Sequence, residues 1–330
     1  MTAVDVLVVG QGFAGTALAW HLRWRGASVL VVDRDDADTA SRVAAGLLTP
    51  VTGKRLAPTR EFGECLSVAT AFYRRAEADT GERFFQQAGA VRLFADASER
   101  ELYVRKSGAD LDPPVRDDWF AAPHGGFGMP AAARLAAEPY LRASQRHFAA
   151  AGAYRVADLD PARDLEPAAD GVRIPRLDVT AGRVVFCQGA AGVGNRWFPD
   201  VPLRPDAGEV LTVRVPGLDE TRTVHRGVWL TPAGGDRFRV GATYARGVMA
   251  AMPTAAGRAE LCGRLGAFLR LPVTVEGHRA AARPVPPDHR PQVRVSGGEP
   301  RVWWFNGLGS KGALTAPAVA ARVVGFGDTH

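Results

Sequence analysis

The sequence has few cysteines and lacks the features of a secreted or membrane-spanning chain. Its 330 residues contain three cysteines, Cys65, Cys187 and Cys262, without the Cys-x-x-Cys spacing of a zinc or redox site. We expect reduced, buried thiols and no metal site. No apolar run reaches the roughly 18 residues that a membrane-spanning helix needs. The first residues lack the basic and apolar regions of a signal peptide. These absences predict a cytoplasmic protein without a membrane partner.

Clusters of basic residues are also missing. The formal net charge is +6, from 41 Lys and Arg against 35 Asp and Glu, but the basic residues are mostly arginines spread thinly along the chain. A positive balance by itself influences solubility and the steering of ligands and does not identify a nucleic-acid partner. We interpret it as a mild preference for anionic substrates.

The most informative pattern lies near the beginning of the chain. An apolar run over residues 4–9 predicts a strand, Gly10-Gln11-Gly12-Phe13-Ala14-Gly15 follows, and residues 13–25 have helical periodicity. A second apolar run then ends in Asp33. A Gly-x-Gly-x-x-Gly sequence between a strand and a helix, with an acid closing the next strand, is typical of a dinucleotide-binding unit.

Each residue of this fingerprint has a physical task. Gly10 permits the tight turn, Gly12 lets the backbone approach a pyrophosphate, and Gly15 lets the helix pack closely on the sheet. The pyrophosphate would lie at the positive end of the helix. Asp33 would accept a hydrogen bond from a ribose hydroxyl. The pattern predicts a bound dinucleotide but does not decide between FAD and a nicotinamide cofactor.

The rest of the chain does not continue as a simple series of alternating strands and helices. We expect helices over 61–79, 139–151, 254–270 and 312–324, and strands near 91–94, 153–156, 172–174, 183–187, 205–215, 223–243 and 273–276, with a turn at 234–236 and no clear prediction over 96–128. This order indicates an α/β (α+β) protein of two lobes. We expect a Rossmann-like nucleotide-binding domain at 1–60, 130–200 and 280–330. An antiparallel-sheet substrate domain would occupy 61–129 and 201–279.

Six further segments resemble those of a known family. They are the loop from Ser41 to Pro50, Arg183–Gly189, Gly208-Glu209-Val210, Val240–Tyr244, Ala282-Arg283-Pro284 with Pro287-Asp288 and Arg290-Pro291, and Asn306–Gly312 with Ala316-Pro317. In this order, and over essentially the whole chain, the sequence resembles the D-amino acid oxidase-like family of FAD-dependent oxidoreductases. One departure is Cys187-Gln188-Gly189, where the family usually has Ala-Thr-Gly.

The resemblance implies FAD as the cofactor. Because no cysteine lies near the C-terminal flavin motif, we expect it to be held noncovalently. The cofactor-binding residues that it implies are Gly10, Gly12, Phe13, Ala14, Gly15, Asp33, Arg34, Ser41, Arg42, Ala45, Gly46, Val156, Gly189, Arg283, Gly307, Gly309, Ser310, Lys311 and Gly312.

Three side chains are candidates for the chemistry. The guanidinium fork of Arg283 matches the two oxygens of a substrate carboxylate, although an arginine before a proline is also compatible with an exposed turn. Tyr244 is the second candidate, as a hydroxyl near the substrate carboxylate or amine. A tyrosine packed between the lobes fits the sequence equally well. Lys311, with backbone amides at Gly307, Gly309 and Gly312, would stabilise negative charge on the reduced flavin. The alternative is a solvated lysine in a glycine-rich turn.

The histidines are expected to have no catalytic role. We place His21 in packing beside the first helix. His225, His278 and His289 fall where we expect loops or strand edges, so we expect them to be solvated.

The activity implied by the resemblance is oxidation of the C–N bond of an amine that carries a carboxylate. Glycine, an N-substituted glycine or a D-amino acid would transfer hydride to flavin N5, and the imine would then hydrolyse. A tRNA-modifying oxidoreductase acting on carboxymethylaminomethyl-uridine is an alternative that the Gly307–Gly312 stretch and the positive charge leave open, although it is not favoured. A dehydrogenase of a non-amine small molecule, a nicotinamide enzyme and a flavin-binding protein without turnover also remain. The electron acceptor and the oligomeric state are open.

Overall fold

The computed structural model describes residues 2–107 and 115–327, and two sheets organise it. The first sheet consists of β1 Thr2–Val9, β2 Val29–Asp33, β10 Tyr154–Val156, β11 Glu166–Ala168, β12 Gly171–Ile174, β13 Val179–Phe186, β20 Gln292–Val295 and β21 Val302–Asn306. The order β10-β2-β1-β13 is parallel throughout. The far edge of β13 pairs with β12 in its first half and with β21 in its second.

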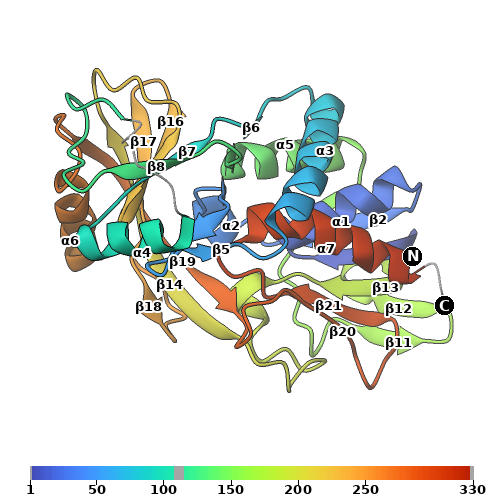
Figure 1. The fold of residues 1–330 in the computed structure, drawn as a ribbon. Helices are drawn as coiled ribbons and strands as arrows, with labels where there is room; N and C mark the ends of the chain where they lie inside the picture. Colours follow the sequence, from blue (N-terminus) through green and yellow to red (C-terminus); the bar gives the residue numbers. More distant parts are fainter. Residues whose placement is uncertain (1, 108–114, 328–330) are drawn as a thin grey trace.

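The second sheet has the order β18-β14-β17-β16-β15-β7-β8, with β19 on the other side of β14. Its strands are β7 Ala90–Leu93, β8 Gly126–Met129, β14 Arg204–Arg214, β15 Thr223–Arg226, β16 Val228–Gly234, β17 Arg237–Gly241, β18 Ala245–Arg246 and β19 Thr274–Val285. All its pairings are antiparallel except β7 with β15. Figure 1 shows this sheet on one side of the molecule and the first sheet on the other.

Helices and short strands complete the chain. The helices are α1 Phe13–Trp24, α2 Ala40–Val43, α3 Phe62–Thr80, α4 Ala97–Ser107, α5 Ala137–Ala150, α6 Ala255–Gly266 and α7 Gly312–Gly327, with short 3-10 turns at Pro175–Leu177 and Gly189–Gly192. The short strands are β3 Leu47–Leu48, β4 Val51–Thr52, β5 Ala57–Pro58, β6 Phe85–Gln86 and β9 Ala133–Leu135. No helix within the described residues is long and apolar enough to cross a membrane.

The main core lies between the first sheet and the helices on one of its faces. Along β1, Val6 and Val8 pack in the cluster that includes α1, α3, α5 and α7, whereas Leu7 and Val9 pack in a second cluster on the opposite face. Successive strand residues point to opposite faces, so a strand covered on both faces is apolar at every position. The second sheet has its own core, to which α6 contributes Leu261 and Leu265.

Most of the predicted elements are present. The mixed α/β fold is confirmed, as is the hairpin turn between β16 and β17. Three predictions were wrong in extent: the strand near 273–276 continues to Val285, the strand near 183–187 begins at Val179, and the helix over 254–270 ends at Gly266. Helix α4 lies in the region without a prediction, of which 108–114 are outside the described residues. All three cysteines are free thiols; Cys65 and Cys187 are buried as expected, and Cys262 is half-buried.

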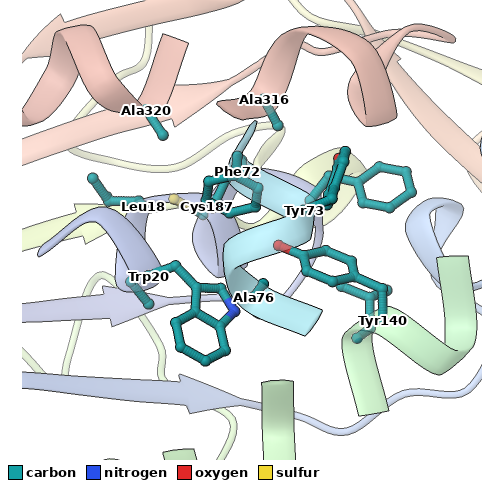
Figure 2. Packing of buried hydrophobic residues seen from close by; sticks show 14 of the residues in the cluster. Leu18, Trp20, Phe72, Tyr73, Ala76, Tyr140, Cys187, Ala316 and Ala320 are labelled. Carbon is teal, nitrogen blue, oxygen red and sulfur yellow. The ribbon is translucent and has the colours of Figure 1, made fainter. Parts of the chain in front are cut away.

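Helix α7 contains a proline whose effect is compensated by a tyrosine of α3. Pro317 has no N–H, so the carbonyl of Ala313, one turn earlier, lacks its helical donor. The hydroxyl of Tyr73 donates to that carbonyl at 2.7 Å. The ring of Tyr140 lies edge-on to Tyr73, with centroids 5.2 Å apart, but its buried hydroxyl has no partner among the described residues (Figure 2). Tyr73 therefore supplies the hydrogen bond that Pro317 removes.

Replacing Tyr73 by Phe will lower the free energy of unfolding by about 1–3 kcal/mol, because it leaves a buried carbonyl without a donor. The matched change Tyr140→Phe, at a hydroxyl without a partner among the described residues, will cost little or nothing. Urea unfolding of both variants provides the measurement. In a Pro317→Ala background the restored backbone amide can donate to the carbonyl of Ala313, so the cost of Tyr73→Phe will shrink. Equal costs in the two backgrounds would contradict this account.

Candidate active site

One cavity of about 1020 Å³ extends from the glycine fingerprint to the second sheet. Residues 9–14 at the end of β1 and the start of α1 line it, as do residues 308–314 at the start of α7. The second sheet contributes Trp229 from β16 and Arg283 from β19. This volume is at the upper end of the range for ligand pockets, so the cavity has room for a large ligand.

The fingerprint glycines are required by close contacts. Gly10 has a φ of +105°, and a Cβ there would lie 2.5 Å from the carbonyl oxygen of Cys187. A Cβ on Gly15 would lie 1.9 Å from the carbonyl oxygen of Gly10, so only glycine lets α1 approach the turn this closely. These contacts confirm the predicted tight turn and the close packing of helix on sheet.

Side chains from two other segments fix the backbone at the start of α1. Asp33, at the end of β2, accepts a hydrogen bond from Gln11 N at 2.6 Å and another from Asp35 N at 2.8 Å. Ser41 Oγ accepts one from Phe13 N at 3.1 Å. Both side chains line the cavity. The amide groups at this end are thereby held beside the cavity.

The N-termini of α1 and α7 meet at the cavity. A Cβ on Gly312 would lie 2.8 Å from the ring of Phe13, so the first residue of α7 touches the first residue of α1. Each helix N-terminus carries a partial positive charge. Two such ends side by side make this part of the cavity favourable for anionic groups.

Lys311 precedes α7 and lies on the cavity. Its Nζ donates to Thr59 Oγ1 at 3.2 Å, and burial lowers the pKa of its ammonium. The amides of Gly309 and Lys311 donate to the carbonyls of Pro284 and Leu308, so they are not free for a ligand as the sequence had suggested. The lysine is therefore half-buried rather than a solvated turn residue.

Two arginines of the second sheet hold the loop that precedes β3. Arg239 of β17 donates from Nη1 to Ala44 O at 2.7 Å and from Nη2 to Val43 O at 2.5 Å. Arg279 of β19 donates to Ala37 O and, at 2.9 Å, to Asp38. Burial lowers the pKa of Arg239 to about 10, which leaves it charged at neutral pH. Since residues 43–47 line the cavity, these contacts position part of its wall.

Arg283 of β19 has an unusual environment on the cavity wall. Its guanidinium carbon lies 4.5 Å from the ring centre of Tyr244. Nε donates a long hydrogen bond, 3.5 Å, to Asp206 O, whereas Nη2 is enclosed and has no partner among the described residues. Tyr244 is 66% exposed, which excludes packing between the lobes. Both residues line the cavity.

Four of the predicted cofactor residues lie outside the cavity lining. Gly15 packs against Gly10, and a Cβ on Gly307 would point at Pro286, 2.6 Å away. Arg42 is buried and pairs with Asp35 at 2.6 Å, so it supports the loop from behind. Val156 is 63% exposed on the edge strand β10, and its neighbour Ala157 lines the cavity instead. The cavity does bring together Gly10, Gly12, Phe13, Ala14, Asp33, Arg34, Ser41, Ala45, Gly46, Gly189, Arg283, Gly309, Ser310, Lys311 and Gly312.

The histidine predictions were partly wrong. His225 lies within β15, between β16 and β7, and lines the cavity, and His278 lies on β19 with Nε2 2.7 Å from a carboxylate oxygen of Glu209. His289 is exposed as predicted. His21 is packed in the core as predicted, and burial lowers its pKa to about 4. The pairing of β7 with β15, which brings Arg92 beside His225, has no local signal in the sequence.

Comparison with known proteins identifies the family. The family model "FAD dependent oxidoreductase" (DAO) matches residues 5–325. The chain belongs to the DAO family of FAD-dependent oxidoreductases. A relative from Rhizobium etli, an oxidoreductase named for thiamine biosynthesis (ThiO), is 30% identical and aligns over 96% of this chain and 94% of its own. Glycine oxidase from Bacillus licheniformis is 25% identical, with 95% and 90% covered.

Solved structures of two glycine oxidases share the fold. Glycine oxidase from Bacillus cereus superposes with a TM-score of 0.81 at 20% identity, covering 99% of this chain and 96% of that one. The corresponding enzyme from Geobacillus kaustophilus gives 0.80 at 19% identity, with 98% and 94% covered. At such identities the likeness establishes the fold alone.

The cavity fits the cofactor of the DAO family. FAD is a long anionic dinucleotide, and the cavity offers the glycine turn and two adjacent helix N-termini to its pyrophosphate. Asp33 lies at the end of β2, where the dinucleotide fold places the ribose. This protein is an FAD-dependent oxidoreductase.

Replacing Arg239 by Met will weaken FAD binding by roughly tenfold to a hundredfold, because two hydrogen bonds from a charged donor to the loop carbonyls are lost. Titration of the protein freed of cofactor with FAD, followed by flavin fluorescence, provides the measurement. Arg237→Met is the matched control, since Arg237 lies on the same strand but pairs with Glu276 near the surface. An equal loss of affinity in both variants would contradict a positioning role for Arg239.

Proposed function

We propose that this DAO-family enzyme oxidises the C–N bond of a small amine that carries a carboxylate. The observation that supports the proposal is the environment of Arg283. Its guanidinium lines the cavity, lacks an ion-pair partner among the described residues and has an enclosed, unpartnered Nη2. A buried donor without a partner is costly, and a carboxylate is the acceptor that best matches a guanidinium fork.

The neighbours of Arg283 leave its charge available. Asp206 is close by, but its carboxylate pairs with Arg204 at 2.8 Å, and Arg283 contacts only the backbone oxygen of Asp206. The ring of Tyr244 lies against the guanidinium. Such stacking holds the plane of an arginine without using its donors. The arrangement favours a bound anion over an internal salt bridge.

FAD, when bound, supplies the acceptor for the electron pair and hydrogen removed from the carbon that bears the amine. Lys311 and the N-terminus of α7 add positive potential to the part of the cavity that they line, which favours negative charge that develops there. In this proposal Arg283 orients the substrate through its carboxylate, and positioning accounts for much of the rate. The likeness to glycine oxidase from Bacillus licheniformis agrees with a small amino acid or N-substituted glycine.

The proposal predicts that glycine, N-methylglycine or a D-amino acid will bleach the flavin absorbance of the purified holoenzyme without oxygen. Arg283→Met will raise the KM for such a substrate about a hundredfold or more, because a buried charge-assisted contact is worth roughly 2–5 kcal/mol. The KM of Arg283→Lys will lie between those of the wild type and Arg283→Met, since lysine keeps the charge and loses the fork.

Arg294→Met, at an exposed position on β20, serves as the control and will leave the KM unchanged. The flavin spectrum of each variant reports whether the cofactor is retained. A flavin that stays oxidised with all three classes of amine, or equal KM values for wild type and Arg283→Met, would refute the proposal.

A tRNA-modifying activity is the second candidate. The chain is 31% identical over 323 residues to the bifunctional MnmC protein of Maricaulis maris, which is named for tRNA 5-methylaminomethyl-2-thiouridine biosynthesis. It spans 50% of that protein. Binding of tRNA that weakens steeply with salt would favour this candidate, because phosphate contacts release counterions. The absence of salt-sensitive binding would remove it.

A further inference from the structure

A row of residues across the second sheet faces the cavity. In register, Arg92 of β7 lies opposite His225 of β15, His225 opposite Trp229 of β16, and Trp229 opposite Gly241 of β17. Residues directly opposite on neighbouring strands share one face of the sheet. Arg92, His225 and Trp229 all line the cavity. The part of the cavity wall formed by this row therefore carries polar groups that the proposed contact with Arg283 does not use.

Trp229 forms a flat wall in this row. A Cβ on Gly241 would lie 2.4 Å from Cζ2 and 2.8 Å from Cη2 of the indole. The glycine therefore leaves the space into which the ring of Trp229 extends over β17. Its flat surface suits the apolar part of a ligand.

Arg92 is neutralised by a buried partner. Its Nε donates to Glu99 Oε1 at 3.1 Å and its Nη2 donates to the same oxygen, while Glu99 Oε2 accepts from Ala95 N at 2.8 Å. The side chains of Arg92 and Glu99 are only 6% and 9% exposed. The hydrogen bonds of Arg92 with described residues use Nε and Nη2 and leave Nη1 over. The pair therefore provides a spare donor without a net charge.

His225 adds a neutral group beside this pair. Neither ring nitrogen hydrogen-bonds to another described residue, and Nδ1 is enclosed. Burial, with a smaller contribution from the Arg92 charge, lowers the pKa of His225 to about 3. A neutral imidazole has one donor and one acceptor nitrogen. The row is therefore polar, uncharged and able both to donate and to accept.

We propose that Arg92, His225 and Trp229 form a second subsite, which binds a neutral hydrogen-bonding substituent of the substrate such as a hydroxyl or a carboxamide. This inference rests on the proposed function, in which Arg283 binds the carboxylate. A second carboxylate would lose its hydration without gaining a net positive partner, so the subsite discriminates against it. The preferred substrate is then an N-substituted glycine or an amino acid with a neutral polar arm, larger than glycine.

The test compares N-substituted glycines with the holoenzyme under steady-state conditions. The arms have two to four carbons and end in a hydroxyl, a carboxamide, a methyl group or a carboxylate. The series therefore also shows which arm length connects the carboxylate site at Arg283 with the subsite. We expect kcat/KM for the best hydroxyl or carboxamide compound to exceed those of the methyl and carboxylate compounds of equal length by about tenfold, the value of one net hydrogen bond.

Variants assign the preference to the subsite. In His225→Phe the kcat/KM ratio between the polar and methyl compounds will fall towards one, and in His225→Gln, which keeps a donor and an acceptor, it will be largely retained. His278→Asn is the matched control, because His278 lies on the same sheet, outside the cavity lining. Its ratio will equal that of the wild type. A ratio is used because it is insensitive to the amount of active enzyme.

The outcomes separate the two proposals. Three results would overturn the subsite and leave the proposed amine oxidation intact. The first is flavin reduction by the series without any preference for neutral polar arms, and the second is a preference for the carboxylate arm. The third is an unchanged kcat/KM ratio in His225→Phe. If no member of the series, nor glycine, nor a D-amino acid reduces the flavin, the proposed function fails and the subsite fails with it.

Discussion

The first residue of α1 and the first residue of α7 are in contact, and this contact limits where both helices can begin. Phe13 and Gly312 are far apart in the sequence, yet the ring of one occupies the space that a side chain on the other would need. Both helices pack on the same face of the first sheet, so their positive ends meet at its carboxyl edge. The whole second sheet lies between α1 and α7 in the sequence, so the chain that builds it must begin and end at positions that allow this contact.

The arginines of this protein have different structural roles, which depend on the groups that they contact. Arg92 is paired and buried, Arg239 holds backbone carbonyls, and Arg283 stacks on an aromatic ring with one nitrogen left over among the described residues. The same side chain therefore forms half of a neutral pair, holds a loop in place or, in the proposed function, binds the substrate carboxylate. The positive net charge of the chain said little about function, because most of these roles are internal.

The sequence allowed the N-terminal unit to be predicted in detail, because its signals are local. Glycine spacing, apolar runs and the acid at Asp33 all lie within one strand–helix–strand unit. The C-terminal glycines and Arg283 were found through family resemblance. The burial of His225 and the place of Arg92 on the cavity were not predicted, because both follow from the parallel pairing of β7 with β15, which no local pattern encodes. Arg42 was misplaced for the same reason, since its partner Asp35 becomes visible only once the loop is folded.

The loop held by Arg239 and Arg279 has a consequence for the stability of the whole protein. It lines part of the cavity and is hydrogen-bonded to the second sheet. The same loop therefore contributes both to the cofactor site and to the contact between the two sheets. Ligand binding and folding are then linked by mass action: free FAD well above its dissociation constant adds RT ln(1 + [L]/Kd) to the stability. A cell short of flavin would hold this enzyme in a looser and more easily degraded form, so its abundance would follow the supply of its cofactor.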